Sequence, residues 1–127
     1  LMSWEVELTD EFGAWWDDLD ESEQDSIDHG VRLLEAQGPS LPYPYSSDIK
    51  DSKHGNMREL RVQHRGDTYR VFYAFDPRRS AILLIGGNKT GDDQFYEHMI
   101  PLADRIYDQH LQNLDHETKP TDPTKRR

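Results

Sequence analysis

Cysteine is absent from the 127-residue sequence, which excludes disulfide bonds, thiolate zinc sites and cysteine nucleophiles. Apolar residues are scarce, at 34% of the chain with a mean hydropathy of −0.97. No apolar run approaches the roughly 18 residues that a membrane-spanning helix needs. The first residues also lack the basic region and apolar stretch of a secretory signal. We therefore expect a cytoplasmic protein.

Basic side chains are in short supply overall, with 15 Lys and Arg against 25 Asp and Glu and a formal net charge of −10. Residues 1–49 hold 13 acids and one base, residues 50–90 nine bases and four acids, and residues 91–127 eight acids and five bases. Because polyanion binding depends on the local field, the basic middle segment favours such a partner. The alternative is that basic strands complement acidic helices within one small fold.

Aromatic residues are well represented, at 10% of the chain, which is enough for a compact core in one domain. Residues 3–8 alternate between apolar and polar and predict a short strand. Two amphipathic helices follow, and the second ends at Gly38-Pro39. Their inward positions are Phe12, Trp15, Trp16 and Leu19 in the first helix, and Ile27, Val31 and Leu34 in the second.

The periodicity changes from helical to strand-like in the middle of the chain. Residues 38–56 contain three prolines and predict an irregular connection. Residues 57–64, 67–75 and 80–87 then form three β runs with short turns between them, which predicts an antiparallel meander. Residues 81–85 are apolar on both faces, so we expect them to form the central, covered strand.

A last helix is predicted to begin at Asp92 or Asp93, and Pro101 should kink or split it. The element order is β-α-α-β-β-β-α, which indicates an α+β fold: a small antiparallel sheet with two N-terminal helices and a C-terminal helix. We expect a single domain over residues 1–114. Residues 115–127 are polar and contain two prolines, so we expect a disordered tail.

Two arginines are the strongest candidates for chemistry, since no metal-ligand spacing and no Ser/His/Asp set stands out. Apolar residues of the first two β runs fall on one face, which leaves Arg61 and Arg70 on the other. If the apolar faces pack on the helices, both arginines lie on the uncovered side. Neighbouring strands are about 4.8 Å apart, so the two side chains could hold one phosphate, with Lys89 at the same rim. The alternative is that the arginines pair with Glu59, Asp67 or helix carboxylates.

Three segments with a fixed order and spacing resemble a known superfamily. They are Met57-Arg58-Glu59-Leu60-Arg61, then Thr68-Tyr69-Arg70-Val71-Phe72-Tyr73, and finally Lys89-Thr90 before a helix with Ala103 and Arg105. Together they resemble the RelE/ParE toxin superfamily, and most closely its HigB-like branch, also described as phage-derived Gp49-like proteins. The resemblance extends over roughly residues 3–112, and the element order agrees with it.

The resemblance implies the toxin of a type II toxin–antitoxin system: a ribosome-dependent mRNA endonuclease that acts without a metal or cofactor. A cognate antitoxin, commonly a helix-turn-helix protein (HigA-like) in this branch, would neutralise it. The implied catalytic residues are Arg70, Arg61, Lys89 and His54, with His54 as a candidate general base. The implied RNA-binding residues are Lys53, Arg58, Arg65 and Tyr96.

The sequence departs from the superfamily pattern in two respects. Many members are basic overall, whereas this chain is at −10. The C-terminal Asp/Tyr/His cluster of some relatives is not evident either, so the general acid and base stay open. Two alternatives remain on the same fold. One is a ParE-like protein that inhibits DNA gyrase, and the other is a non-toxic transcriptional co-repressor.

Overall fold

The computed structural model describes residues 3–118, and its elements follow the predicted order with one additional strand. The chain folds into three helices, a short 3₁₀ turn (η1) and one five-stranded sheet. In chain order the elements are β1 (Val6–Leu8), α1 (Asp10–Asp17), α2 (Glu21–Gln37), η1 (Gly38–Ser40), β2 (Ser46–Asp48), β3 (Arg58–His64), β4 (Asp67–Phe75), β5 (Ala81–Asn88) and α3 (Phe95–Thr118). The α+β class is thereby confirmed, and no helix in the described part of the chain is long and apolar enough to cross a membrane.

The sheet is mixed, with strand order β1-β5-β4-β3-β2. Strands β3, β4 and β5 form the predicted antiparallel meander, but β1 pairs with β5 in parallel, so a wholly antiparallel sheet was a wrong expectation. The strand at the centre is β4, not residues 81–85, because β1 adds to the far side of β5. Strand β2 was also missed, since Ser46–Asp48 has no apolar alternation and is defined by its pairing with β3.

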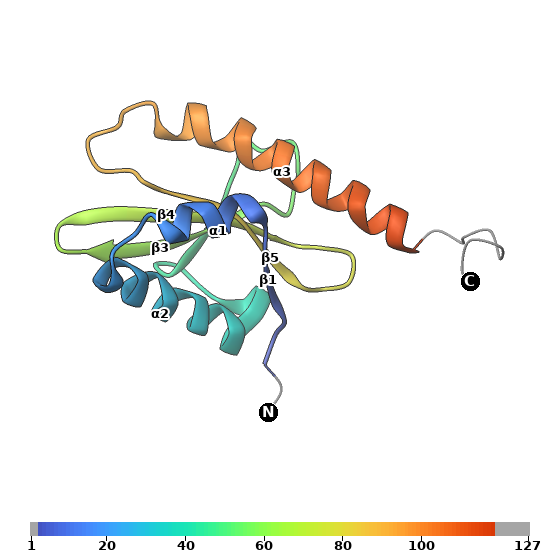
Figure 1. Ribbon diagram of the computed structural model, residues 1–127, viewed down its shortest axis with the longest axis horizontal. Coiled ribbons are helices and arrows are strands. Elements are labelled where there is room, and N and C mark those ends of the chain that lie inside the picture. Colours follow the sequence, from blue (N-terminus) through green and yellow to red (C-terminus); the bar gives the residue numbers. More distant parts are fainter. Residues whose placement is uncertain (1–2, 119–127) are drawn as a thin grey trace.

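Helices cover both faces of the sheet (Figure 1). Helices α1 and α2 lie on one face, where Phe12, Ile27 and Leu34 pack against a first core. Helix α3 lies on the other face and packs on a second core. The sheet residues of the first core are Leu60, Val62, Tyr69, Val71, Tyr73, Ala81 and Leu83; those of the second are Phe72, Ala74, Ile82 and Leu84, joined by Met57 just before β3.

Two consecutive glycines let strand β5 fit between the helices. A Cβ atom on Gly86 would lie 2.3 Å from the Trp15 ring, and one on Gly87 would lie 2.8 Å from the Phe95 ring. Successive strand residues face opposite sides of a sheet, so each glycine admits an aromatic ring on a different face. Because neither glycine has a side chain, the Trp15 ring of α1 and the Phe95 ring of α3 can pack directly against strand β5.

Helix α3 runs without a break through Pro101, so it is not split as the proline had suggested. Pro101 is exposed, where water can hydrogen-bond the carbonyl group that the missing N–H leaves free. The helix ends at Thr118, so residues 115–118 of the expected tail are helical. The rest of that tail, residues 119–127, lies outside the described residues.

Candidate functional site

Arg61 and Arg70 face each other directly across strands β3 and β4, as the strand pattern predicted. The Arg61 N–H donates to the Tyr45 carbonyl (2.9 Å) on the side away from β4. The two arginines are therefore a pair without hydrogen bonds between their backbones, the type in which side chains lie closest. Two like charges in this position destabilise a sheet unless an opposite charge compensates them.

Glu59 supplies that opposite charge. The residue is 4% exposed. Its carboxylate accepts hydrogen bonds from Ser47 Oγ (2.7 Å) and from the Tyr96 hydroxyl (2.7 Å). The same carboxylate lies 3.4 Å from Arg70 Nε and 3.5 Å from Arg61 Nη1. One buried carboxylate thus connects β2, β3, β4 and α3.

Tyr96 closes this group from helix α3. Its hydroxyl donates to Glu59 and accepts from Arg70 Nε (3.2 Å). Burial, followed by the hydrogen bond to Glu59, raises the pKa of the Tyr96 phenol, so the phenol stays neutral and remains a donor. Lys89 Nζ lies 5.9 Å from the centre of the Tyr96 ring. We call the six residues the arginine cluster: Ser47, Glu59, Arg61, Arg70, Lys89 and Tyr96.

The arginine cluster does not lie on a bare sheet, so that part of the prediction is wrong. Helix α3 covers this face, and Arg70 is only 6% exposed. The sequence already indicated that this face is covered, because the apolar residues Phe72 and Ala74 lie on the same face of β4 as Arg70 and need burial. Pairing of the arginines with Glu59 was the alternative left open, and it is the arrangement observed. Ser47 gave no sequence signal.

His54 and Lys53 lie at a different part of helix α3. His54 Nε2 hydrogen-bonds Asp108 (2.8 Å), and Lys53 Nζ forms an ion pair with the same carboxylate (2.5 Å). Asp108 follows Tyr96 by twelve positions, which is about 18 Å along a helix at 1.5 Å per residue. No contact within the described chain joins His54 to the arginine cluster, so the structure does not bring the two together.

The other two predicted RNA-binding residues are also separate from the arginine cluster. Arg58 lies on the opposite face of β3, where it contacts Asp48, the Tyr73 hydroxyl and the Leu41 carbonyl. Arg65 is exposed in the β3–β4 turn and has a positive φ of 49°. These two positions and the Lys53–His54 pair therefore do not form one continuous cationic site with Arg61 and Arg70.

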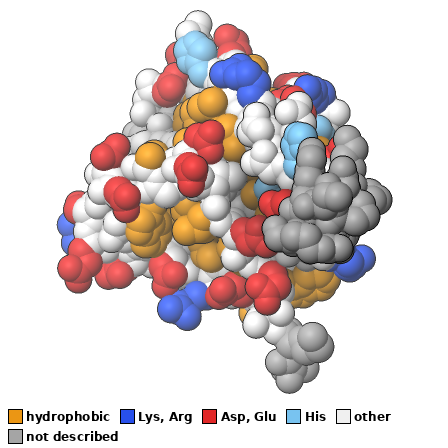
Figure 2. All heavy atoms as spheres, turned by 45° about the vertical axis from the view of Figure 1, so that its right-hand side comes forward, with side chains coloured by type: hydrophobic (Ala, Val, Ile, Leu, Met, Phe, Trp, Pro, Cys, Tyr) orange, Lys and Arg blue, Asp and Glu red, His pale blue; other side chains and the backbone are white. Residues whose placement is uncertain are grey.

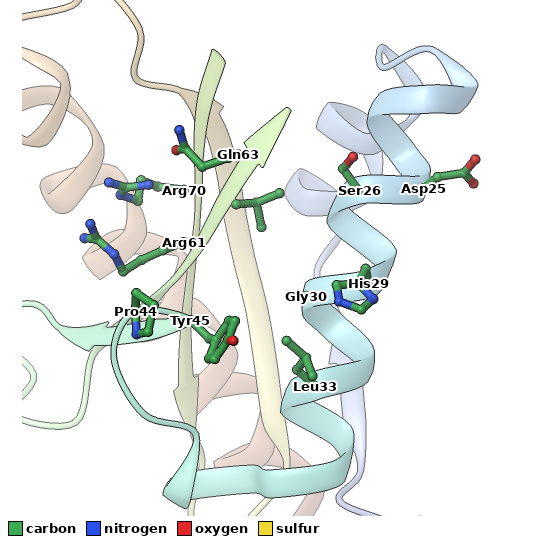
Figure 3. A pocket seen from close by; sticks show the side chains of 11 residues that line it. Asp25, Ser26, His29, Gly30, Leu33, Pro44, Tyr45, Arg61, Gln63 and Arg70 are labelled. Atoms are coloured by element: carbon green, nitrogen blue, oxygen red, sulfur yellow. The ribbon is translucent and has the colours of Figure 1, made fainter. Parts of the chain in front are cut away.

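A groove of about 560 Å³ lies between helix α2 and strand β3 (Figure 3). Arg61 and Arg70 lie on one side of β3, whereas Leu33 and Tyr45 lie on the side that faces α2. Asp25, Ser26 and His29 of α2 also line the groove, so it has one cationic side and one side that mixes apolar and polar residues. Over the face shown in Figure 2, acidic side chains are spread widely and Lys and Arg occur only in isolated places.

The arrangement of sheet and helices places the chain in the RelE-like fold class. A mutant of the E. coli toxin RelE, solved in the free state, superposes with a TM-score of 0.54 at 9% sequence identity. The match covers 77% of this chain and 96% of that chain. At this level of identity the likeness concerns the fold.

The particular family follows from the sequence comparisons. The sequence model of the family described as phage derived protein Gp49-like matches residues 14–108. Two relatives from Mycobacterium tuberculosis (strain ATCC 25618 / H37Rv) bear the names "Putative toxin HigB2", 35% identical over 121 residues, and "Putative toxin HigB3", 39% identical over 101 residues. The alignments cover 94% and 79% of this chain, and 59% and 87% of those relatives. The chain belongs to the Gp49-like family and is similar in sequence to relatives named as HigB toxins, which confirms the family resemblance read from the sequence; its likeness to RelE concerns the fold.

Proposed function

We propose that this protein is the toxin of a type II toxin–antitoxin system and cuts mRNA on the ribosome. The observation that carries the proposal is the cross-strand pair Arg61 and Arg70, which lines an open groove. The toxin names of the two relatives and the RelE-like fold support the same class. The partners of the proposed function are the ribosome, its mRNA and a cognate antitoxin of the helix-turn-helix type.

The proposed reaction is an internal transesterification of RNA. The ribose 2′-oxygen forms a bond to the adjacent phosphorus as the bond from phosphorus to the 5′-oxygen breaks. The products are a 2′,3′-cyclic phosphate and a 5′-hydroxyl, and the proton that leaves the 2′-hydroxyl is balanced by one that reaches the 5′-oxygen. The transition state has extra negative charge on the phosphoryl oxygens, so the protein must supply cations there.

Arg70 and Arg61 are the residues we assign to that charge. A guanidinium group stays protonated and can donate to two phosphoryl oxygens at once. Arg61 reaches solvent, with a side chain that is 25% exposed, and Lys89 lies beside the Tyr96 ring on the same side of the sheet. Arg70 is the more rigid of the two arginines, because Tyr96, Glu59 and the Tyr69 carbonyl all contact it.

The proton transfers have two candidate groups. Tyr96 is a neutral donor that already contacts Arg70, which suits protonation of the leaving oxygen or stacking on a base. His54 as general base stays a prediction, and so do RNA contacts by Lys53, Arg58 and Arg65. For His54 to act, RNA would have to extend along α3 from the arginine cluster to Asp108.

Mapping of mRNA cuts in a cell-free translation reaction tests the proposed function. We expect cuts in phase with codons, only when ribosomes are present, and a loss of at least about a hundredfold in Arg70→Ala because an electrostatic contact in the transition state is removed. Arg70→Lys should recover little, since an ammonium group cannot make the two-point contact. Arg32→Ala, at an exposed position on α2, is the matched control and should cut normally.

Intact mRNA and unhindered translation with a folded protein would contradict the nuclease. A change in plasmid supercoiling would then point to gyrase inhibition, and binding to its own promoter together with a partner would point to a co-repressor.

A further inference from the structure

The loop between η1 and β2 carries two exposed tyrosines beside the arginine cluster. Tyr43 is 69% exposed and Tyr45 is 48% exposed, and only Leu8 joins them as a large apolar side chain in water within residues 3–118. Single apolar residues at a surface are ordinary, whereas apolar groups gathered at one place indicate a binding surface. This loop therefore presents aromatic surface next to two cations.

The two tyrosines face different directions. Tyr45 lies on the side of β3 that faces helix α2 (Figure 3). Tyr43 lies against Arg61, whose guanidinium carbon is 4.9 Å from the centre of the Tyr43 ring. A cation over the face of an aromatic ring is a favourable contact. Arg61 thus occupies one face of the Tyr43 ring, and the high exposure of this residue leaves the other face open to solvent.

The backbone that carries Tyr43 is held in place on the side of β2. The N–H groups of Tyr45 and Ser46 both donate to the Pro42 carbonyl (2.9 and 3.1 Å), and Ser46 is only 1% exposed. Pro42 and Pro44 also flank Tyr43, and proline restricts its own backbone and that of the residue before it. A ligand that covers the ring therefore has little ordering of the loop to overcome.

We propose that Tyr43 stacks on the base of a nucleotide whose phosphate, or the next one along the strand, contacts Arg61 and Arg70. The inference rests on the proposed function for the nature of the strand, and it adds the residue that contacts a base. Every base has a flat π-face, so such stacking accepts any sequence and varies only with the strength of the stack. A purine offers the larger face and should be favoured at this position.

The neighbouring groups favour a nucleotide in a single strand. Arg61 contacts Tyr43 and faces Arg70, so the cations and the open ring lie side by side, as phosphate and base do in one nucleotide. A small anion would satisfy the arginines but leave the ring uncovered. A duplex would bring phosphates, but its bases are stacked on one another and are not free to cover Tyr43.

The test compares two short strands of 2′-O-methylated ribose, which lack the attacking hydroxyl and cannot be cut. One carries a single adenine among base-free riboses, and the other has the same phosphates and no base. We expect the unchanged protein to bind the adenine strand about tenfold more tightly, the effect of one stacked base. Tyr43→Ala should bind both strands equally. Tyr43→Phe should keep the preference, because stacking needs the ring and not the hydroxyl.

Tyr45→Ala is the matched control, an exposed tyrosine on the same loop that faces α2, and it should keep the preference for adenine. A second measurement needs no variant: in NMR spectra the ring protons of Tyr43 should shift with the adenine strand and not with the base-free strand. The proposal is overturned if the unchanged protein binds the two strands equally, if Tyr43→Ala keeps the preference, or if Tyr45→Ala loses it.

These outcomes are separate from those of the translation assay. Cuts in phase with codons, together with equal binding of the two strands, would support the nuclease and refute stacking by Tyr43. A preference for adenine that disappears in Tyr43→Ala, in a protein that cuts no mRNA, would refute the nuclease and still establish Tyr43 as a contact to a base.

Discussion

A single carboxylate lies against two opposed arginines on strands β3 and β4. Arg61 and Arg70 lie directly opposite each other, and Glu59 contacts both from a position that is 4% exposed. Ser47 and Tyr96 donate to the same carboxylate, so it makes four contacts in all. A buried charge with this many partners holds its neighbours in one orientation. Glu59 therefore orients Arg61 and Arg70, the two arginines that we propose bind the phosphate of the RNA.

Glu59→Gln tests this positioning role. The substitution keeps the shape but leaves two opposed guanidinium groups without a counter-charge. We expect the free energy of unfolding, measured with urea, to fall by about 3 kcal/mol, as when one partner of a buried ion pair is removed. Glu97→Gln, at an exposed position on the same helix as Tyr96, should change it by less than about 0.5 kcal/mol. Equal stability of the two variants would show that Glu59 does not hold the arginines.

A second buried carboxylate, Asp76, fastens the β4–β5 turn to helix α3. Its side chain is fully buried and accepts hydrogen bonds from His110 Nε2 (2.9 Å), Arg78 Nε (3.0 Å) and the Ser80 N–H (3.1 Å). Burial alone raises the pKa of Asp76. The bonds from His110, Arg78 and Ser80 outweigh it, so the pKa lies below its ordinary value.

Asp76→Asn should therefore destabilise the protein in a pH-dependent way. A carboxyl with a lowered pKa stabilises the fold above its unfolded pKa of about 3.9, and that contribution disappears as the pH falls through the folded pKa. We expect Asn to lower the free energy of unfolding by about 2 kcal/mol at neutral pH, with the difference shrinking below about pH 4. Asp93→Asn, which is exposed, is the control. A difference that grows on acidification would contradict the assignment.

At the scale of elements, Thr9 joins the start of helix α1 to strand β5. Its Oγ1 accepts from the Phe12 N–H (3.0 Å) as the helix N-cap and donates to the Leu84 carbonyl (2.7 Å). We expect Thr9→Ala to lower the free energy of unfolding by about 1–2 kcal/mol, because it removes the cap and the bond to the sheet together. Thr9→Ser retains both bonds and should lose much less. Chemical denaturation of the three proteins measures this, and equal stability of Ala and Ser would refute it.

Local periodicity predicted the elements that have an apolar face, and it failed where position depends on distant partners. The two N-terminal helices and the meander show clear periods, so their order and inward residues were predictable. Strand β2 is defined only by its bonds to β3, and the parallel pairing of β1 depends on a crossover. A pattern within one segment contains neither kind of information.

The candidate site likewise has one part that a local pattern predicts and another that depends on residues distant in sequence. Arg61 and Arg70 share a face because strands have a period of two, and a short turn sets their register, so the pair could be predicted. Ser47 and Tyr96 reach Glu59 from 12 and 37 positions away in sequence, and nothing local indicates those contacts. The covering by α3 was inferable, since Phe72 and Ala74 beside Arg70 are apolar.

At the scale of the whole molecule, the cationic side of the groove is small and the rest of the chain is acidic. With a net charge of −10, long-range attraction cannot bring this protein to RNA. Under the proposed function, binding would come from the few phosphates that Arg61, Arg70 and Lys89 contact. Such binding has a shallow dependence on salt, because few counterions are released.

The salt dependence of binding to a short single-stranded RNA measures that number. Each neutralised phosphate on a single strand contributes about −0.7 to the slope of log affinity against log salt, so three contacts give about −2. Arg61→Ala should make the slope shallower by about 0.7, whereas Arg32→Ala, on the acidic helix α2, should leave it unchanged. A slope steeper than about −5 would require a broad cationic surface that includes Lys53, Arg58 and Arg65. The arginine cluster would then be one part of a larger RNA interface, not its centre.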